Sequence, residues 1–165
     1  MNPCPCGYRG DPNRDCQCTV PQVERYMSKI SGPLLDRIDI HLEVSAVPFH
    51  ELAAKQPGTS SDAIREQVGV AREIQQKRFE HSRSLGHRWN ARMTTREVRH
   101  HCHIEKKPMD LLRTAVSTLG LSARAHDKVL RVARTIADLD RAETICAQHI
   151  SEAIQYRLLD RKLWT

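Results

Sequence analysis

Hydrophobic positions follow no regular period at the start of the chain. Residues 1–20 hold many Pro, Gly, Asp and Asn residues, which favour turns and loops over regular structure. Residues 21–30 begin with Pro21, which suits the first turn of a helix, and the Gly-Pro pair at 32–33 would end that helix. The pattern therefore predicts a loop followed by one short helix.

Residues 38–44 (IDIHLEV) alternate between apolar and polar side chains, which is the period of a half-buried strand. No other segment of the chain predicts a strand convincingly. A lone strand is unstable because its backbone N–H and C=O groups lack partners. We therefore expect its partner strands to lie in another chain, or in an N-terminal part that this chain lacks.

A helical period begins near residue 60. Residues 61–80 predict a helix that Ser60 or Ser61 would cap. The apolar positions of this segment recur at three- and four-residue spacing, as expected for one buried helix face. They are Ile64, Val68, Ala71 and Ile74.

Four further helices are predicted, each with its own start or stop signal. Thr94 and Glu97 form a capping-box pair at the start of the first. Pro108 suits the start of the second, and Gly120 would end it. Ser122 would cap the third. The expected helices cover residues 94–102, 108–119, 122–139 and 147–159.

The predicted fold class is mainly α. Residues 1–57 resemble a remnant of an α/β layer, with one strand and one short helix. Residues 58–93 predict a helix followed by a basic linker. Residues 94–165 predict a helical unit able to hold a core of its own.

Composition supports a helical core, since 39% of the residues are hydrophobic and only 4% are aromatic. No apolar run reaches the roughly 18 residues that a membrane span needs. The N-terminus also lacks the basic start and apolar stretch of a signal peptide. We therefore expect a cytoplasmic protein with no membrane partner.

Positive charge is concentrated in the middle of the chain. Residues 58–107 carry 11 basic and 6 acidic side chains, a net charge of +5 within a total of +6. The linker at 81–93 has no acidic residue and interleaves arginine with tryptophan, a pattern that can hold phosphate and stack a base. Its candidate nucleic-acid contacts are Arg83, Arg88, Trp89 and Arg92. The alternative, which we favour, is a solvated connector with Trp89 packed on the helical unit.

Four of the six cysteines form the spacing C-x-C-x9-C-x-C near the N-terminus. Disulfides are rare in a cytosolic setting, so metal binding or plain thiols are expected there. Four thiolates joined by a turn could bind one Zn²⁺ tetrahedrally. An iron–sulfur site and four reduced thiols are the alternatives. The candidate metal ligands are Cys4, Cys6, Cys16 and Cys18.

Three segments, in this order, resemble the magnesium-chelatase branch of AAA+ ATPases and most closely its YifB/ComM-like subfamily. They are residues 1–7 (MNPCPCG), residues 31–39 (SGPLLDRID), and residues 120–124 (GLSAR) followed by 129–138 (VLRVARTIAD). Each motif alone is weak, but the three occur in the order of the family and are followed by a matching ending at residues 153–157 (AIQYR). The resemblance as a whole covers nearly the whole chain. The resemblance implies that residues 1–57 come from an ATPase core and residues 94–165 from its helical lid.

The resemblance also implies roles for three residues. Asn2 would be the sensor-1 residue, Arg37 the arginine finger, and Arg124 the sensor-2 residue. A planar guanidinium can meet the charge that develops on the γ-phosphate during hydrolysis. The alternatives are a surface Arg37 paired with Asp36 or Asp39, and a solvated Arg124.

The parent protein implied by the resemblance is a homo-oligomeric ring that binds ATP and Mg²⁺ between subunits. The subfamily suggests action on DNA, of the helicase or branch-migration kind linked to competence. The chain contains no G-x-x-x-x-G-K-[ST] motif and no Walker-B strand, which would lie upstream of Met1. We therefore expect the chain to be inactive alone. The rival hypothesis is a small helical module that binds zinc through four cysteines and binds nucleic acid without any ATPase role.

Overall fold

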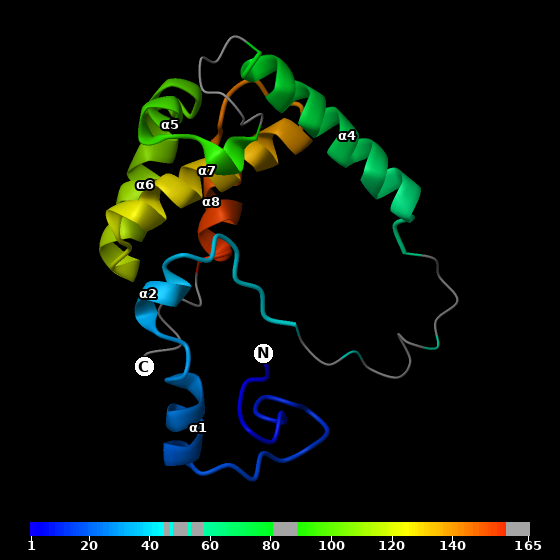
Figure 1. Ribbon diagram of the computed structural model, residues 1–165, viewed down its shortest axis with the longest axis vertical. Coiled ribbons are helices and arrows are strands. Elements are labelled where there is room, and N and C mark those ends of the chain that lie inside the picture. Colours follow the sequence, from blue (N-terminus) through cyan, green and yellow to red (C-terminus); the bar gives the residue numbers. More distant parts are fainter. Residues whose placement is uncertain (45–46, 48–52, 54–57, 81–88, 158–165) are drawn as a thin grey trace.

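The computed structural model describes residues 1–44, 47, 53, 58–80 and 89–157, and in these ranges the protein is mainly helical (Figure 1). Pairing of β type within these ranges is limited to one parallel bridge between Ile104 and Ile145. None of the described helices is long and apolar enough to cross a membrane. The helices are α1 (Val20–Met27), α2 (Gly32–Leu35), α4 (Ser61–Arg78), the 3-10 helix η1 (Asn90–Arg92), α5 (Thr95–His101), α6 (Lys106–Leu119), α7 (Ala123–Leu139) and α8 (Ala147–Gln155).

The predicted capping residues are confirmed. The Oγ atoms of Ser60, Thr94 and Ser122 each accept a hydrogen bond from a backbone N–H three residues later, at the starts of α4, α5 and α7. Gly120 ends α6 with φ +63°, a left-handed conformation that costs glycine little. The three hydroxyl groups and Gly120 therefore fix where these helices begin and end.

Several helix boundaries differ from the prediction. Helix α1 ends at Met27 rather than at residue 30, and α4 at Arg78 rather than at residue 80. The short helix α2, at the Gly-Pro pair, was not predicted. Helix α6 begins at Lys106 rather than Pro108, because a proline within the first turn removes only an N–H that has no intrahelical partner. Helix α8 ends at Gln155, four residues before the predicted end. Residues 158–165 lie outside the described ranges.

The predicted strand at 38–44 is wrong, since this segment is neither helix nor strand. No described segment lies beside it as a partner strand, so a hydrogen-bonded ladder cannot form. Its backbone is held by the C-terminal unit instead. The His41 N–H donates to the Tyr156 carbonyl at 2.9 Å, and the Arg157 guanidinium donates to the Ile38 carbonyl.

Helix α7 lies at the centre of the helical unit and contacts α4, η1, α5 and α8 (Figure 1). Its inner face is fully buried at Val129, Ala133 and Ala137. Phe79, at the end of α4, belongs to the same core, so the helix before the basic linker packs with the lid helices. The same core also includes residues of α5, α6 and α8, among them Val98, Leu112, Ile150 and Ala153.

A buried carboxylate joins α4, η1 and α7. Asp138 is fully buried, and its two oxygens accept hydrogen bonds from both terminal nitrogens of Arg78. Asn90 Nδ2 donates to it at 2.7 Å, and Arg134 Nε at 3.1 Å. Arg134 also donates to the carbonyls of residues 142 and 143, in the turn before α8. The carboxylate is thus satisfied by groups from three elements.

We expect Asp138→Asn to lower the free energy of unfolding by about 3–5 kcal/mol, because it leaves Arg78 and Arg134 without their buried countercharge. Urea unfolding followed by circular dichroism measures the change. The matched control is Asp110→Asn, which breaks a solvent-exposed pair with Arg113 and should cost less than about 1 kcal/mol. Equal losses for the two variants would contradict the role given to Asp138.

Candidate functional site

The segment that contains Arg37 is attached to the N-terminus of α7. Ser122 Oγ donates to Asp36 Oδ1 at 2.8 Å, and Arg124 Nη1 lies 3.2 Å from Asp36 Oδ2. Ser122 therefore caps α7 and also holds a residue 86 positions away in the sequence. One carboxylate brings together two segments that the sequence singled out separately.

Lys128, one turn further along α7, holds the same segment. Its side chain is only 8% exposed, and its Nζ lies 2.8 Å from Asp39 Oδ1. The same Nζ donates to the Arg37 carbonyl oxygen. Residues 36–39 are thus fixed along the first two turns of α7 by charge-assisted hydrogen bonds.

The Arg37 side chain stays exposed at this junction. Its Nη1 donates to the Pro33 carbonyl at 2.7 Å, inside α2. The two neighbouring carboxylates, Asp36 and Asp39, are engaged by side chains of α7 instead. Among the described residues Arg37 has no acidic partner, so its guanidinium can meet an external anion.

Asp36 is held in its charged form. Its pKa is lowered mainly by the hydrogen bond from Ser122. Partial desolvation opposes this shift, and Arg124 adds smaller contributions that lower the pKa. The contact therefore stabilises the docked segment at neutral pH. This contribution is lost as the pH falls through the lowered pKa of Asp36.

Asn2 does not join this site. Its side chain lies against Gly7, where a Cβ would meet Asn2 Nδ2 at 3.5 Å. Gly7 has φ +85°, a conformation that side chains disfavour. No described contact links Asn2 to Arg37 or Arg124.

The four N-terminal cysteines come together as predicted. Their Sγ atoms all lie within 4.8 Å of one another, and all four thiols are free. Cys4 Sγ lies 3.3 Å from Cys6 Sγ and 3.6 Å from Cys16 Sγ. A tetrahedral site with Zn–S bonds of about 2.3 Å separates its sulfur atoms by roughly 3.8 Å. The cluster therefore has the donor set and nearly the spacing of a zinc site with four cysteine ligands.

Backbone N–H groups, desolvation and neighbouring thiols shift the pKa values in this cluster. The pKa of Cys6 is lowered to about 6, mainly by the backbone N–H of Tyr8. That of Cys18 is raised to about 12, because desolvation and the other thiols outweigh a hydrogen bond from the Cys6 backbone. Four adjacent thiolates repel one another, so full ionisation needs a cation among them.

Only residues 89–93 of the basic linker lie within the described residues. Arg83 and Arg88 lie outside the described residues. Trp89 is 37% exposed and its ring lies 5.5 Å from the Arg72 guanidinium of α4, while Arg92 is exposed in η1. The Arg72 guanidinium lies over the Trp89 ring in a cation–π contact, so this tryptophan contacts α4, the helix before the linker.

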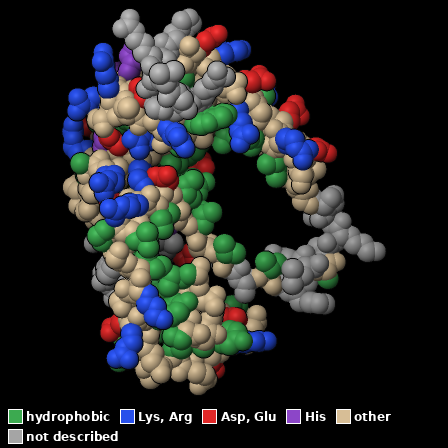
Figure 2. All heavy atoms as spheres, viewed as in Figure 1, with side chains coloured by type: hydrophobic (Ala, Val, Ile, Leu, Met, Phe, Trp, Pro, Cys, Tyr) green, Lys and Arg blue, Asp and Glu red, His purple; other side chains and the backbone are tan. Residues whose placement is uncertain are grey.

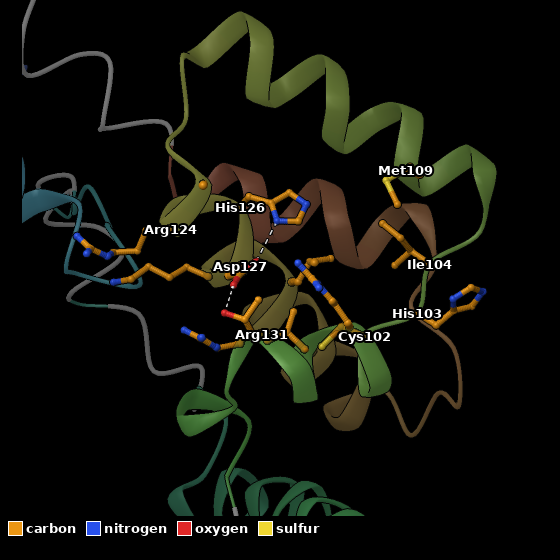
Figure 3. A pocket seen from close by; sticks show the side chains of 14 residues that line it. Cys102, His103, Ile104, Met109, Arg124, His126, Asp127 and Arg131 are labelled. Atoms are coloured by element: carbon orange, nitrogen blue, oxygen red, sulfur yellow. Dashed lines mark hydrogen bonds and ion pairs between the residues drawn. The ribbon is translucent and has the colours of Figure 1, made fainter.

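A cavity between α5, α6 and α7 was not expected from the sequence (Figure 3). Its volume is about 890 Å³, and Arg124 is among the residues that line it. Arg99 and Arg131 line it as well, together with His126 and Asp127, which are hydrogen-bonded to each other. The seven-residue spacing of Arg124 and Arg131 on one helix was the available signal, but the contribution of α5 required the tertiary structure.

Comparison with protein families identifies both parts of the chain. The family described as "Magnesium chelatase, subunit ChlI C-terminal" matches residues 58–157. The family described as "Magnesium chelatase, subunit ChlI" matches residues 1–52. The boundary between the two matches lies just before α4, the helix that packs on α7.

Similar proteins are considerably longer than this chain. It is 41% identical to "Uncharacterized protein YifB" of Escherichia coli (strain K12), over 99% of this chain and 31% of that protein. It is 39% identical to "Competence protein ComM" of Haemophilus influenzae, over 99% of this chain and 30% of that protein. A Mycobacterium bovis protein, Mb2921c, is 35% identical over 94% of the chain. The chain thus spans about 30% of the length of these relatives.

The C-terminal family match alone covers more than half of the sequence, and the second match covers most of the remainder. The alignments with these relatives extend over 99% of this chain, so they include the residues of both family matches. The chain therefore belongs to the magnesium chelatase ChlI family of AAA+ ATPases, in its YifB/ComM-like group.

Proposed function

We propose that this chain is the C-terminal part of a ring-forming AAA+ ATPase, with Arg37 as the arginine finger and Arg124 as the sensor-2 residue. The observation that carries the proposal is the state of Arg37. It is exposed on a segment that Asp36 and Asp39 anchor to α7, while its own guanidinium has no acidic partner among the described residues. An arginine finger needs both a rigid base and a free cationic end.

ATP and Mg²⁺ are the ligands that membership of this family implies for the parent protein. The described residues that fit them are cationic, and they match the lid side of such a site. Arg37 follows Asp36 directly in the chain and Arg124 pairs with Asp36, so both arginines could face one polyphosphate. In this proposal Asp36 holds Arg124 in place, and a phosphate group would compete with the carboxylate for it. Asn2 keeps its proposed sensor-1 role only in the longer parent protein.

The proposed substrate of the ATPase is DNA. The name of the Haemophilus influenzae relative associates that protein with competence, and the middle of this chain carries a net charge of +5. A basic surface favours polyanions. The rival proposal, a zinc-binding nucleic-acid module without ATPase function, predicts the same DNA binding but no dependence of ATP turnover on Arg37.

We further propose that Cys4, Cys6, Cys16 and Cys18 bind one structural Zn²⁺. The ion would neutralise the thiolates and fix the loop before α1, a segment with little apolar bulk of its own. The described geometry supports this proposal through the sulfur spacing of the cluster. The site is structural in character, since four protein ligands leave no open position.

The arginine finger can be tested in a chimera, in which this chain replaces the aligned region of Escherichia coli YifB. We expect the chimera to hydrolyse ATP, and Arg37→Ala to lower kcat by about 10³-fold or more, because the finger stabilises charge on the transferred phosphoryl group. A steady-state phosphate-release assay measures the effect. The isolated chain should show no turnover, since it lacks the phosphate-binding loop.

The matched control for this experiment is Arg25→Ala, which removes an exposed arginine from α1. It should leave kcat unchanged, and size-exclusion chromatography should show the same assembly for all variants. Equal activity of the Arg37 and Arg25 variants, in an active chimera, would refute the role of Arg37. It would favour the rival zinc-module proposal.

Zinc binding predicts about one Zn²⁺ per chain in protein purified under reducing conditions, measured by elemental analysis. Cys16→Ser should lose most of this metal, because three thiolates bind zinc less tightly and leave a ligand position open. Cys146→Ser is the control, since Cys146 is exposed and lies outside the cluster. Stoichiometric iron in the purified chain, or an unchanged metal content in Cys16→Ser, would count against a zinc site with four cysteine ligands.

A further inference from the structure

Two arginines of the lid carry charge that no described acidic residue neutralises. Arg99 on α5 and Arg131 on α7 line the same cavity (Figure 3). The other cations of that cavity are engaged, since Arg124 pairs with Asp36 and Lys128 with Asp39. Asp127, the single acidic residue of its lining, is shared by His126 and Thr95. The cavity therefore has an excess of positive charge.

Arg131 is also incompletely satisfied. Its Nε atom is buried and has no hydrogen-bond partner among the described residues. A buried N–H without an acceptor is destabilising, whereas an anion in the cavity could accept from it. This atom thus indicates a negatively charged ligand.

The positive surface continues beyond the cavity. Arg99 also lines a second hollow of about 450 Å³, together with Arg96, His100 and one acidic residue, Glu97. Figure 2 shows Lys and Arg side chains gathered over α5 and α6, the same side of the helical unit. The charges cover two adjoining hollows, so they suit an extended polyanion better than a single small anion.

The cavity walls between these charges are apolar. Ile104, Met109 and Leu130 contribute to the lining, and Met109 is 39% exposed. A nucleobase can lie against such a surface while its phosphate meets an arginine. This combination of apolar wall and cationic rim is suited to a single nucleic-acid strand.

We infer that the lid binds a single nucleic-acid strand across α5 and α7, with backbone phosphates on Arg99 and Arg131. This inference rests on the proposed action on DNA and assigns it a site apart from the basic linker. The inferred strand site does not use Arg124. That residue lines the cavity but pairs with Asp36, and it keeps its proposed role toward the nucleotide.

The test uses the full chain and a fluorescently labelled oligothymidylate, with binding followed by anisotropy over a range of salt concentrations. Each phosphate contact to a single strand contributes about 0.7 to the slope of log K against log salt. We expect the double variant Arg99→Gln/Arg131→Gln to lower the slope by about 1.4. The single variant Arg99→Gln, at an exposed position, should lower it by about 0.7 and keeps the test valid if the double variant fails to fold.

Two control variants locate the site. Arg65→Gln removes an exposed charge from α4 and should leave binding unchanged. The double variant Trp89→Ala/Arg92→Gln removes the described candidates of the basic linker. The inference is overturned if the linker variant loses binding while the Arg99 and Arg131 variants bind like the unmodified chain. It is also overturned if the unmodified chain does not bind the oligonucleotide.

A competition experiment identifies the ligand. Unlabelled oligothymidylate should displace the probe far better than ATP or inorganic triphosphate at equal phosphate concentration. The inference is overturned if ATP displaces the probe as well as oligothymidylate does and if the Arg99 variant loses this displacement by ATP. The cavity would then be a mononucleotide site. The ATPase proposal is judged separately, because turnover of the chimera depends on Arg37 whether or not the isolated chain binds DNA.

Discussion

The helical unit depends on one buried carboxylate. Asp138 lies on α7 and accepts hydrogen bonds from α4, η1 and its own helix, so three elements share a single charged centre. A buried charge is tolerated only when its partners are in place. The positions of α4 and η1 on α7 are therefore linked, and the apolar core around Val129 and Ala133 closes beneath a polar network that favours one arrangement.

The N-terminal part is attached to this unit through polar contacts rather than through a shared core. Asp36 binds Ser122 and Arg124, and Lys128 binds Asp39. Such contacts are directional and depend on charge, so they position Arg37 without burying it. Attachment of this kind suits a residue that must meet a ligand at the surface, because the backbone is held while the guanidinium stays exposed.

The segment after Arg37 shows how far a sequence pattern depends on its surroundings. Ile38, Ile40, Leu42 and Val44 alternate as in a half-buried strand, yet they are 40–89% exposed. A strand needs a partner strand for its backbone and a cover for its apolar face. The described residues offer two isolated hydrogen bonds to its backbone but neither a partner strand nor such a cover. The relatives that match this chain are about three times as long, so they contain much more chain with which such a segment could pair.

The sequence by itself determined the longer helices, the caps of α4, α5 and α7, the cysteine cluster and the family, because these depend on neighbouring residues or on motifs kept in order. Ser122 and Gly120 act within a few residues of their own positions, and both agree with prediction. Only the tertiary structure decided the contacts of Asp36 with Arg124, the network around Asp138, and the cavity that Arg99 shares with Arg131. Each of these joins side chains from different elements, and no local pattern records which distant charges will meet once the helices pack.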